Sequence, residues 1–502
     1  MWQDILKAAI IGTERSALVL PARNDALGNL LATLDANARE TSLLSAAATV
    51  ALYERAGQLP TVDSQLLPVP AESEDIPCCS ARAAQHLSLL LSGEGKDVLP
   101  DWLAALATAQ QRVPEESLPA LLAAGKSNAS LRELIGKVIG KRGVWLAQQN
   151  LEWDYVGAGL DESLWQTGAR SGRLALLQPL RATDPTRARE LVSSTWSEEK
   201  PEDRAAFIAA FITGLSLADE PFLEAALDDR RKEVRRAAAD LLSRLPASAL
   251  VQRMLVRVTS LITYKRKLLG KGELVVVLPE QCDKAMQRDG IEPKPPHPSI
   301  GEKAWWLQQI IAGVPPSFWN NLCGANAADV ILRTPKEWHN DLLLGWSQAA
   351  IRCGDAEWIE ALLDHANVHN TTLDQAQLME ALTPSRQEVY LTKLLAKSPD
   401  LSGGSLLYRL FMNITHLLSE EFSRTAYQVI VKHMIVSHKQ QDYGLRYYLQ
   451  QLVTHLHPAV LTECLATLAT LRNQAEQLEQ HNIEASLKLL EFRIEMRKEI
   501  KQ

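Results

Sequence analysis

Cysteine is scarce in this chain, which holds six cysteines among 502 residues. They stand at Cys78, Cys79, Cys282, Cys323, Cys353 and Cys464. None belongs to a C-x-x-C pair, and their spacing is irregular. A large chain with few unpatterned cysteines is typical of a reducing compartment, so we expect free thiols and a cytoplasmic location.

Long apolar runs are also missing. No run approaches the ~18 apolar residues that a membrane-spanning helix needs, so we expect no membrane partner. The first 21 residues form the one candidate targeting segment, but Lys7, Glu14 and Arg15 interrupt it. Its apolar residues recur at helical spacing instead, which predicts a docked amphipathic helix. These residues are Trp2, Ile5, Leu6, Ala9 and Ile10.

Aromatic residues make up only 6% of the chain, and β-branched residues are sparse beside leucine and alanine. This balance favours helices over sheets. A chain of 502 residues exceeds one ordinary globular core, unless it is a repeat array that grows in one dimension. The net charge of −7 argues against a protein that coats DNA.

A repeated helix pair is the clearest pattern present. Asp184-Pro185 and Glu220-Pro221 each have the form of a helix start, because an acidic residue caps well and proline suits the first helical position. The two prolines are 36 residues apart, and matched apolar positions in the second helices are 30 apart. Both intervals approach the repeat lengths of helical solenoids. The apolar stripes comprise Ala188, Leu191 and Val192, then Phe207, Ile208, Phe211, Ile212 and Leu215, then Val234, Ala238, Leu241 and Leu245.

The string DDRRKEVRRAAADLLSRLP, residues 228–246, resembles the second helix of a HEAT repeat. The predicted fold is therefore all-α, an α-solenoid of HEAT-like helix pairs. One short strand-like insertion is expected at 273–280, where ELVVVLPE is the single strand-like run.

Proline clusters suggest the domain boundaries. Prolines crowd the segment near residue 70 and the string PKPPHP at 293–298, which predicts a surface loop and a stiff linker. The predicted organisation is an N-terminal helical segment (1–55), a proline-rich loop (56–82), a HEAT-like repeat domain (83–292), a proline linker (293–298) and a C-terminal helical domain ending in a long helical hairpin (299–502).

Motifs for catalysis or cofactor binding are weak. ALLAAGKS at 120–127 lacks the first glycine of a phosphate-binding loop and lies in a helical pattern. His365 and His369 have metal-ligand spacing, but no third ligand is evident. No G-x-S-x-G motif or triad pattern occurs. We predict that the chain is not an enzyme and binds no cofactor or metal.

A basic stretch between Asp228 and Lys271 has a local charge of +8, against −15 for the rest of the chain. It could bind an acidic partner protein or nucleic acid, or simply solvate helix faces. Because Tyr264 is the single aromatic residue of the stretch that could stack on a base, protein is the favoured partner. The candidate partner-binding residues are Arg231, Lys232, Arg235, Arg236, Lys265, Arg266 and Lys267. Six of the twelve tryptophans fall between Trp305 and Trp358, in the core or on a binding surface.

Four strings together resemble an uncharacterised bacterial HEAT-like family. They are IGTER (11–15), IGKRGVWLAQQNLEW (139–153), LRATDPTRAREL (180–191) and the string at 228–246. Members of that family are typically encoded beside a MoxR-type AAA+ ATPase, a von Willebrand factor A-domain protein and a SWIM zinc-finger protein. The resemblance implies a non-catalytic scaffold or adaptor in an ATPase-driven assembly or remodelling system. A nucleic-acid-binding HEAT-like protein that uses residues 228–271 is the alternative.

Overall fold

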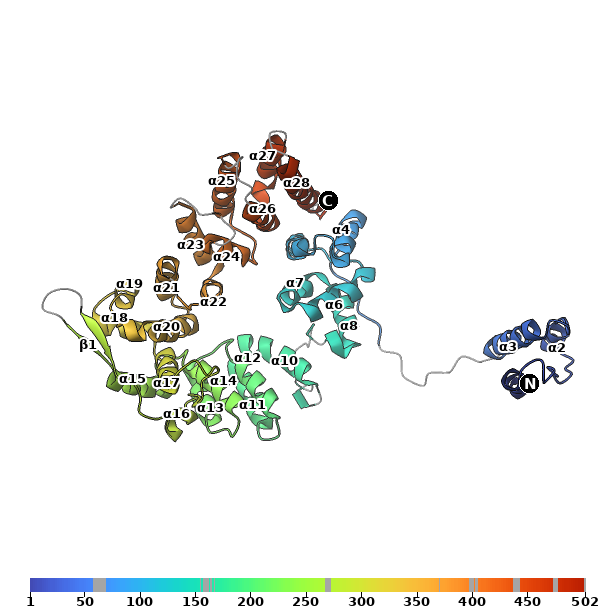
Figure 1. The fold of residues 1–502 in the computed structure, drawn as a ribbon, viewed down its shortest axis with the longest axis horizontal. Helices are drawn as coiled ribbons and strands as arrows, with labels where there is room; N and C mark the ends of the chain where they lie inside the picture. The colour runs from blue at the N-terminus through green and yellow to red at the C-terminus, as the bar shows by residue number, and fades with distance from the viewer. Residues whose placement is uncertain are drawn as a thin grey trace. The chain divides into compact units, whose positions relative to one another are not determined.

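The computed structural model describes residues 1–56, 69–153, 155–156, 162, 165–166, 168–266, 272–369, 371–396, 401, 405–436, 443–472 and 477–500. The described chain is mostly helical, with one small two-stranded sheet. It divides into two compact units, Met1–Pro70 and Ala71–Gln502 (Figure 1).

The first unit holds helices α1 (Trp2–Ile11), α2 (Ala26–Leu31) and α3 (Arg39–Ala56). Helices α1 and α2 both pack against α3, around a small core of Ile5, Leu27, Ala46 and Val50. The helix predicted at the N-terminus is confirmed, but its predicted buried face is wrong in part. Since α1 has only α3 as a large neighbour, Ile5 and Ala8 are buried while Trp2, Leu6, Ala9 and Ile10 stay exposed.

The second unit holds the remaining helices. Its first half comprises α4 (Ala81–Ser92), α5 (Leu99–Thr108), α6 (Leu118–Ser127), α7 (Arg132–Val138), α8 (Gly140–Gln148), α10 (Arg170–Thr183), α11 (Pro185–Thr195), α12 (Pro201–Ala210), α13 (Glu220–Ala226), α14 (Lys232–Leu242), α15 (Ala249–Leu261) and α16 (Lys284–Arg288). Its second half comprises α17 (Glu302–Ala312), α18 (Pro316–Cys323), α19 (Ala327–Ile331), α20 (His339–Cys353), α21 (Ala356–Val368), α22 (Gln375–Glu380), α23 (Pro384–Ala396), α24 (Leu406–Met412), α25 (Glu420–Val436), α26 (Tyr443–His455), α27 (Leu461–Arg472) and α28 (Gln477–Ile500).

The predicted helix starts at Asp184 and Glu220 are confirmed. The Asp184 carboxylate accepts a hydrogen bond from the Arg187 amide at 2.9 Å, which caps α11, and α13 begins at Glu220. The apolar stripes are buried as predicted except at three positions: Leu215 and Leu245 are half-buried, and Ile212 is exposed. Ile212 is exposed because α12 ends at Ala210, before the helical face could carry Ile212 inward.

Alternate helices of the second unit pack against one another in sequence order. Helix α12 contacts α10 and α14, and α24 contacts α22 and α26. Helix α20 contacts α17 across two intervening α-helices. The helices between them in sequence pack on their neighbours, as α13 does on α14, α21 on α20 and α25 on α26 (Figure 1). One hydrophobic cluster extends from Trp165 to Leu490 through this arrangement.

The proline segment 293–298 is mostly exposed, but it begins against this packing. The Pro293 carbonyl accepts a hydrogen bond from the Trp306 indole at 2.8 Å, and Ile291 is buried in the cluster. The sequence predicts a domain boundary here, whereas the structure divides the chain at Pro70. Apolar side chains before and after the prolines share one core, which a proline count along the sequence does not reveal.

The residues just after Pro70 also differ from the predicted surface loop. Glu74 reaches the start of α8, where its carboxylate accepts hydrogen bonds from the amides of Lys141 and Arg142 at 2.9 and 2.8 Å. A carboxylate at this position satisfies free amides and matches the helix dipole. The Cys79 amide donates to the Arg112 carbonyl, so this end of the predicted loop is held on the second unit.

The strand-like run is confirmed as β2 (Glu273–Val276), which pairs antiparallel with β1 (Ile262–Lys265). Strand β1 continues directly from α15 and was not predicted. The pair is held to the helices through Ile262 and Leu274, which are buried in the main cluster.

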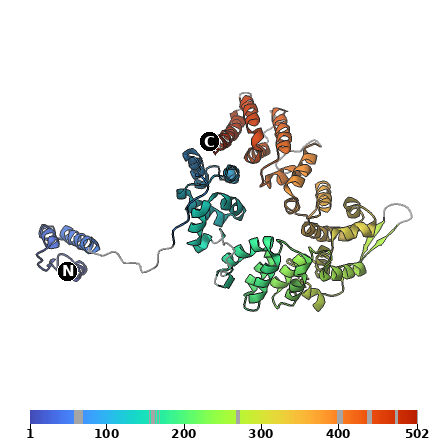
Figure 2. The same cartoon turned by 180° about the vertical axis from the view of Figure 1, so that it is seen from behind.

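The last helix, α28, joins two hydrophobic clusters. Leu487 and Leu490 belong to the main cluster, whereas Met496 and Ile500 pack among residues between Cys79 and Val156. Helix α28 packs against α26 and α27 and also against α4 and α5 (Figures 1 and 2). The two ends of the second unit therefore meet at this helix.

No single helix among the described residues is both long and apolar enough to cross a membrane. One bent pair, Tyr447–His455 with Pro458–Arg472, passes that test by length and composition, with a bend of 115°.

Candidate functional site

The predicted basic stretch does not form one cationic surface. Three of its arginines, Arg236, Arg253 and Arg257, form ion pairs with acids from outside the stretch. Arg244 pairs with Asp240 inside the stretch. Arg253 contacts Glu224 at 2.9 Å and Asp289 at 2.8 Å, and Arg257 contacts Asp289 at 2.6 Å. These ion pairs offset part of the local charge counted along the sequence.

The candidate partner-binding residues lie on different elements. Arg231 and Lys232 are exposed at the start of α14, and Arg235 donates to the Asp229 carbonyl at 2.8 Å. Lys265 and Arg266 are exposed at the end of β1, which Figures 1 and 2 show apart from α14. Lys267 lies outside the described residues. Arg236 lines a pocket to which the other described candidate residues do not contribute.

That pocket has a volume of about 360 Å³ and lies where five helices and one loop meet. Helices α14, α15, α17, α20 and α22 supply its walls, together with the loop after α16. Its charged and aromatic lining residues are Arg236, Asp240, Arg244, Asp289, Glu292, Trp305 and Arg352. Residues from 236 to 377 in the sequence thus converge on one polar cavity.

Asp240 positions two of the arginines. Its carboxylate accepts a hydrogen bond from Arg352 Nε at 2.8 Å and from Arg244 Nε at 3.3 Å. Arg244 also donates to the Arg352 carbonyl, and Arg352 donates to the Ala312 carbonyl. Burial raises the pKa of Asp240, but Arg352 and Arg244 lower that pKa by more, so the net pKa lies below its ordinary value.

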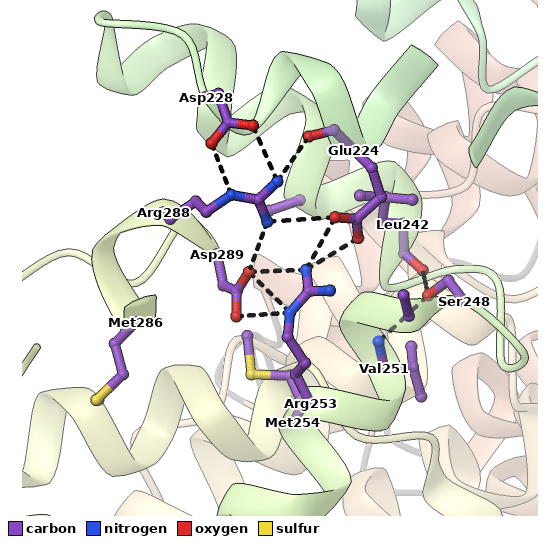
Figure 3. Close-up of polar contacts among 12 residues, drawn as sticks. Glu224, Asp228, Leu242, Ser248, Val251, Arg253, Met254, Met286, Arg288 and Asp289 are labelled. Atoms are coloured by element: carbon purple, nitrogen blue, oxygen red, sulfur yellow. Dashed lines mark hydrogen bonds and ion pairs between the residues drawn. The ribbon is translucent and has the colours of Figure 1, made fainter. Parts of the chain in front are cut away.

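An ion-pair network behind the pocket fixes the loop that follows α16. Asp289 is only 2% exposed and is contacted by Arg253, Arg257 and Arg288. Figure 3 shows Arg288 between Asp228 and Glu224, and Arg253 between Glu224 and Asp289. Because these contacts join α13, α15 and α16, the pocket wall formed by 289–292 is held in place.

The other sequence candidates lie elsewhere. The glycine-lysine-serine string ends α6, where Lys126 forms an ion pair with Glu152 at 2.8 Å instead of facing a phosphate-binding loop. His339 Nε2 lies 2.9 Å from His365 Nε2, and the His365 and His369 rings are 4.5 Å apart. Within the described residues, however, no group of three or more His, Cys, Asp or Glu is arranged to hold a metal ion.

The tryptophan-rich segment is mostly core. Trp319, Trp346 and Trp358 are fully buried; the Trp346 ring packs T-shaped against Trp319 and at a tilt against Trp358. Trp305 is partly buried at the pocket. One tryptophan of this segment thus lines the pocket beside Arg236.

Sequence reasoning missed Asp240, Arg352 and Asp289 as parts of a site. A signal was available at α14, since Arg236 and Asp240 are four residues apart and share one face of this helix, and Arg244 follows at the same spacing just beyond its end. The contributions of α20 and α22 had no such signal, because only tertiary packing brings them to α14.

Comparison with known families places the chain. Residues 4–500 match the model of DUF5691, a family of unknown function. The chain belongs to this family. The DUF5691 match covers the pocket and nearly all of both units, which confirms the expectation of an uncharacterised family. The gene neighbours implied by the sequence resemblance remain predictions. Searches of curated proteins and of solved structures each found no match.

Proposed function

We propose that this DUF5691 chain is a non-catalytic scaffold or adaptor that binds protein partners. The observation that carries the proposal is the mixed-charge pocket of about 360 Å³, assembled from five helices and opening beside a row of packed helices. A pocket that combines fixed arginines, carboxylates and a tryptophan has the composition of a protein-recognition site.

The packing order of the helices supports an α-solenoid of HEAT-like pairs as the framework. Each helix of the rows α10, α12, α14 and α22, α24, α26, α28 contacts the next one in its row, with a further helix between them in sequence. Such arrays hold extended surfaces of fixed shape, on which separate partners can bind.

The partners to test first follow from the family resemblance. They are a MoxR-type AAA+ ATPase and a von Willebrand factor A-domain protein, with a cytoplasmic location. The nucleic-acid alternative has less support, because acids such as Glu224, Asp240 and Asp289 lie among the basic residues and would repel a phosphate backbone.

The test measures binding of the purified full chain to each purified partner and to labelled duplex DNA near physiological salt. We expect a saturable complex with at least one partner protein. We expect DNA affinity no tighter than the ~10⁻⁴–10⁻⁶ M of non-specific binding. A nanomolar DNA complex without protein binding would replace the scaffold proposal with the nucleic-acid alternative. Turnover of a substrate by the isolated chain would overturn the non-catalytic assignment.

A further inference from the structure

The pocket is large enough to hold one or two side chains of a partner protein and too small to hold a DNA duplex. Ligand pockets in proteins begin near 300 Å³, and this one has about 360 Å³. That volume accommodates one or two side chains of a peptide segment. Its walls carry both apolar and charged groups, with Trp305, Met254 and Ile351 among the apolar ones.

Three guanidinium groups at the pocket keep unused donors. The Arg236 side chain is 76% exposed, and the ion pair that it forms with Glu292 is long at 3.6 Å. Arg244 and Arg352 use Nε and Nη1 in hydrogen bonds, and neither Nη2 has a hydrogen-bond partner in the described chain. A guanidinium has five N–H donors, so each of these three side chains can donate hydrogen bonds to a further anion.

The charges of the pocket leave a small positive excess. Asp289 is neutralised from behind by Arg253, Arg257 and Arg288, none of which lines the pocket. The three lining arginines then face only two further carboxylates, Asp240 and Glu292. One additional carboxylate would neutralise this excess charge, whereas a polyanion would be repelled by Asp240 and Glu292.

We propose that the pocket binds an acidic segment of a partner protein. An aspartate or glutamate side chain pairs with Arg236 and with the free Nη2 groups of Arg244 and Arg352. A neighbouring apolar side chain packs against Trp305. Because Asp240 already holds Arg244 and Arg352, little side-chain entropy is lost when the carboxylate binds. This proposal rests on the proposed function, since it specifies how the scaffold recognises a protein.

The test begins with short random peptides displayed on phage and selected against the full chain. A selected peptide is then synthesised with an amidated C-terminus and a fluorescein label, and its binding is measured by fluorescence polarisation. We expect the selected peptides to carry Asp or Glu beside an apolar residue. Replacing that acid by its amide should weaken binding about tenfold, since an ionic hydrogen bond is lost.

Matched variants assign the binding to the pocket. Arg236→Ala and Arg236→Glu should each weaken the acidic peptide about tenfold or more. Lys303→Glu makes the same charge change as Arg236→Glu at an exposed position of α17 outside the pocket, and it should leave the affinity unchanged. Circular dichroism of each variant checks that the fold is retained.

Several results would overturn the assignment. One is an equal loss of peptide affinity in Arg236→Glu and Lys303→Glu. Another is equal affinity for the acidic peptide and its amide form. A third is binding of a labelled DNA oligonucleotide that only Arg236→Glu abolishes. If peptides or partner proteins bind but ignore Arg236, the pocket assignment fails and the scaffold function stands. If neither peptides nor partner proteins bind the chain at all, both fail.

Discussion

Arg493 on α28 and Asp101 on α5 form a buried ion pair across 392 positions of sequence. Arg493 Nη2 lies 2.7 Å from Asp101 Oδ2, and the two side chains are 0% and 5% exposed. Arg493 also donates to the carbonyls of Val453 and Leu456, which end α26 and its following turn. One side chain thus ties α5, α26 and α28 together.

Removing Asp101 should destabilise the second unit. Asp101→Ala would leave the guanidinium of Arg493 buried without its carboxylate, at a cost of about 3–5 kcal/mol in unfolding free energy. Arg82→Ala is the matched control, because Arg82 pairs with Glu499 of the same helix but is 72% exposed. That change should cost less than about 1 kcal/mol. Urea denaturation measures the unfolding free energy of both variants. Similar decreases would show that the buried ion pair contributes no more to stability than the exposed one.

Truncation should separate the two proposed boundaries. A fragment of residues 71–502 should fold and unfold cooperatively, because it retains the whole main cluster and α28. A fragment of residues 71–295 loses α17, which packs on α15, and α28, which packs on α4 and α5. It should therefore aggregate or lose its cooperative transition. A stable, monomeric fragment 71–295 would instead favour the boundary predicted at 293–298.

The register of α14 gives a third prediction. Val234 is fully buried, so Val234→Asp should place an unpaired charge between helices and cost about 3–5 kcal/mol. Lys232→Ala, at an exposed position two residues earlier, should change stability by about 0.5 kcal/mol or less. Thermal denaturation of the two variants provides the measurement. Equal melting temperatures would contradict the assigned helix face.

His365 should make stability depend on pH. Burial, followed by the nearby His339 and His369, lowers the pKa of His365 to about 4. The unfolded chain protonates this ring near pH 6.5, whereas the folded chain resists protonation until about pH 4. Its contribution is therefore complete above about pH 6.5 and is lost progressively as the pH falls toward 4, by at most about 3 kcal/mol.

The measurement is the difference in unfolding free energy between pH 7 and pH 5. His365→Leu should show a smaller decrease than the unmutated chain, because the variant has no ring to protonate. His297→Gln, which changes an exposed histidine, should keep the full decrease. An unchanged pH dependence in His365→Leu would show that the cluster does not titrate as described.

Much of the local structure could be predicted because it depends on nearby residues. Asp184 and Pro185 define the start of α11 through a cap and a fixed backbone angle, and both effects act within one turn. The buried faces of α11 and α14 followed from apolar spacing for the same reason. Ile212 was misassigned because the pattern did not reveal that α12 ends at Ala210.

By itself the sequence determined that the chain is helical, where its repeated helix pairs begin and which residues of those helices are buried. Tertiary structure alone decided what the charges do. Arg253 and Arg257 look like surface cations in sequence, but Asp289 and Glu224 neutralise them once the helices pack. Tertiary structure also brought Arg352 to Asp240 across 112 positions and Arg493 to Asp101 across 392. Such pairings depend on how the helices stack, which local spacing does not encode.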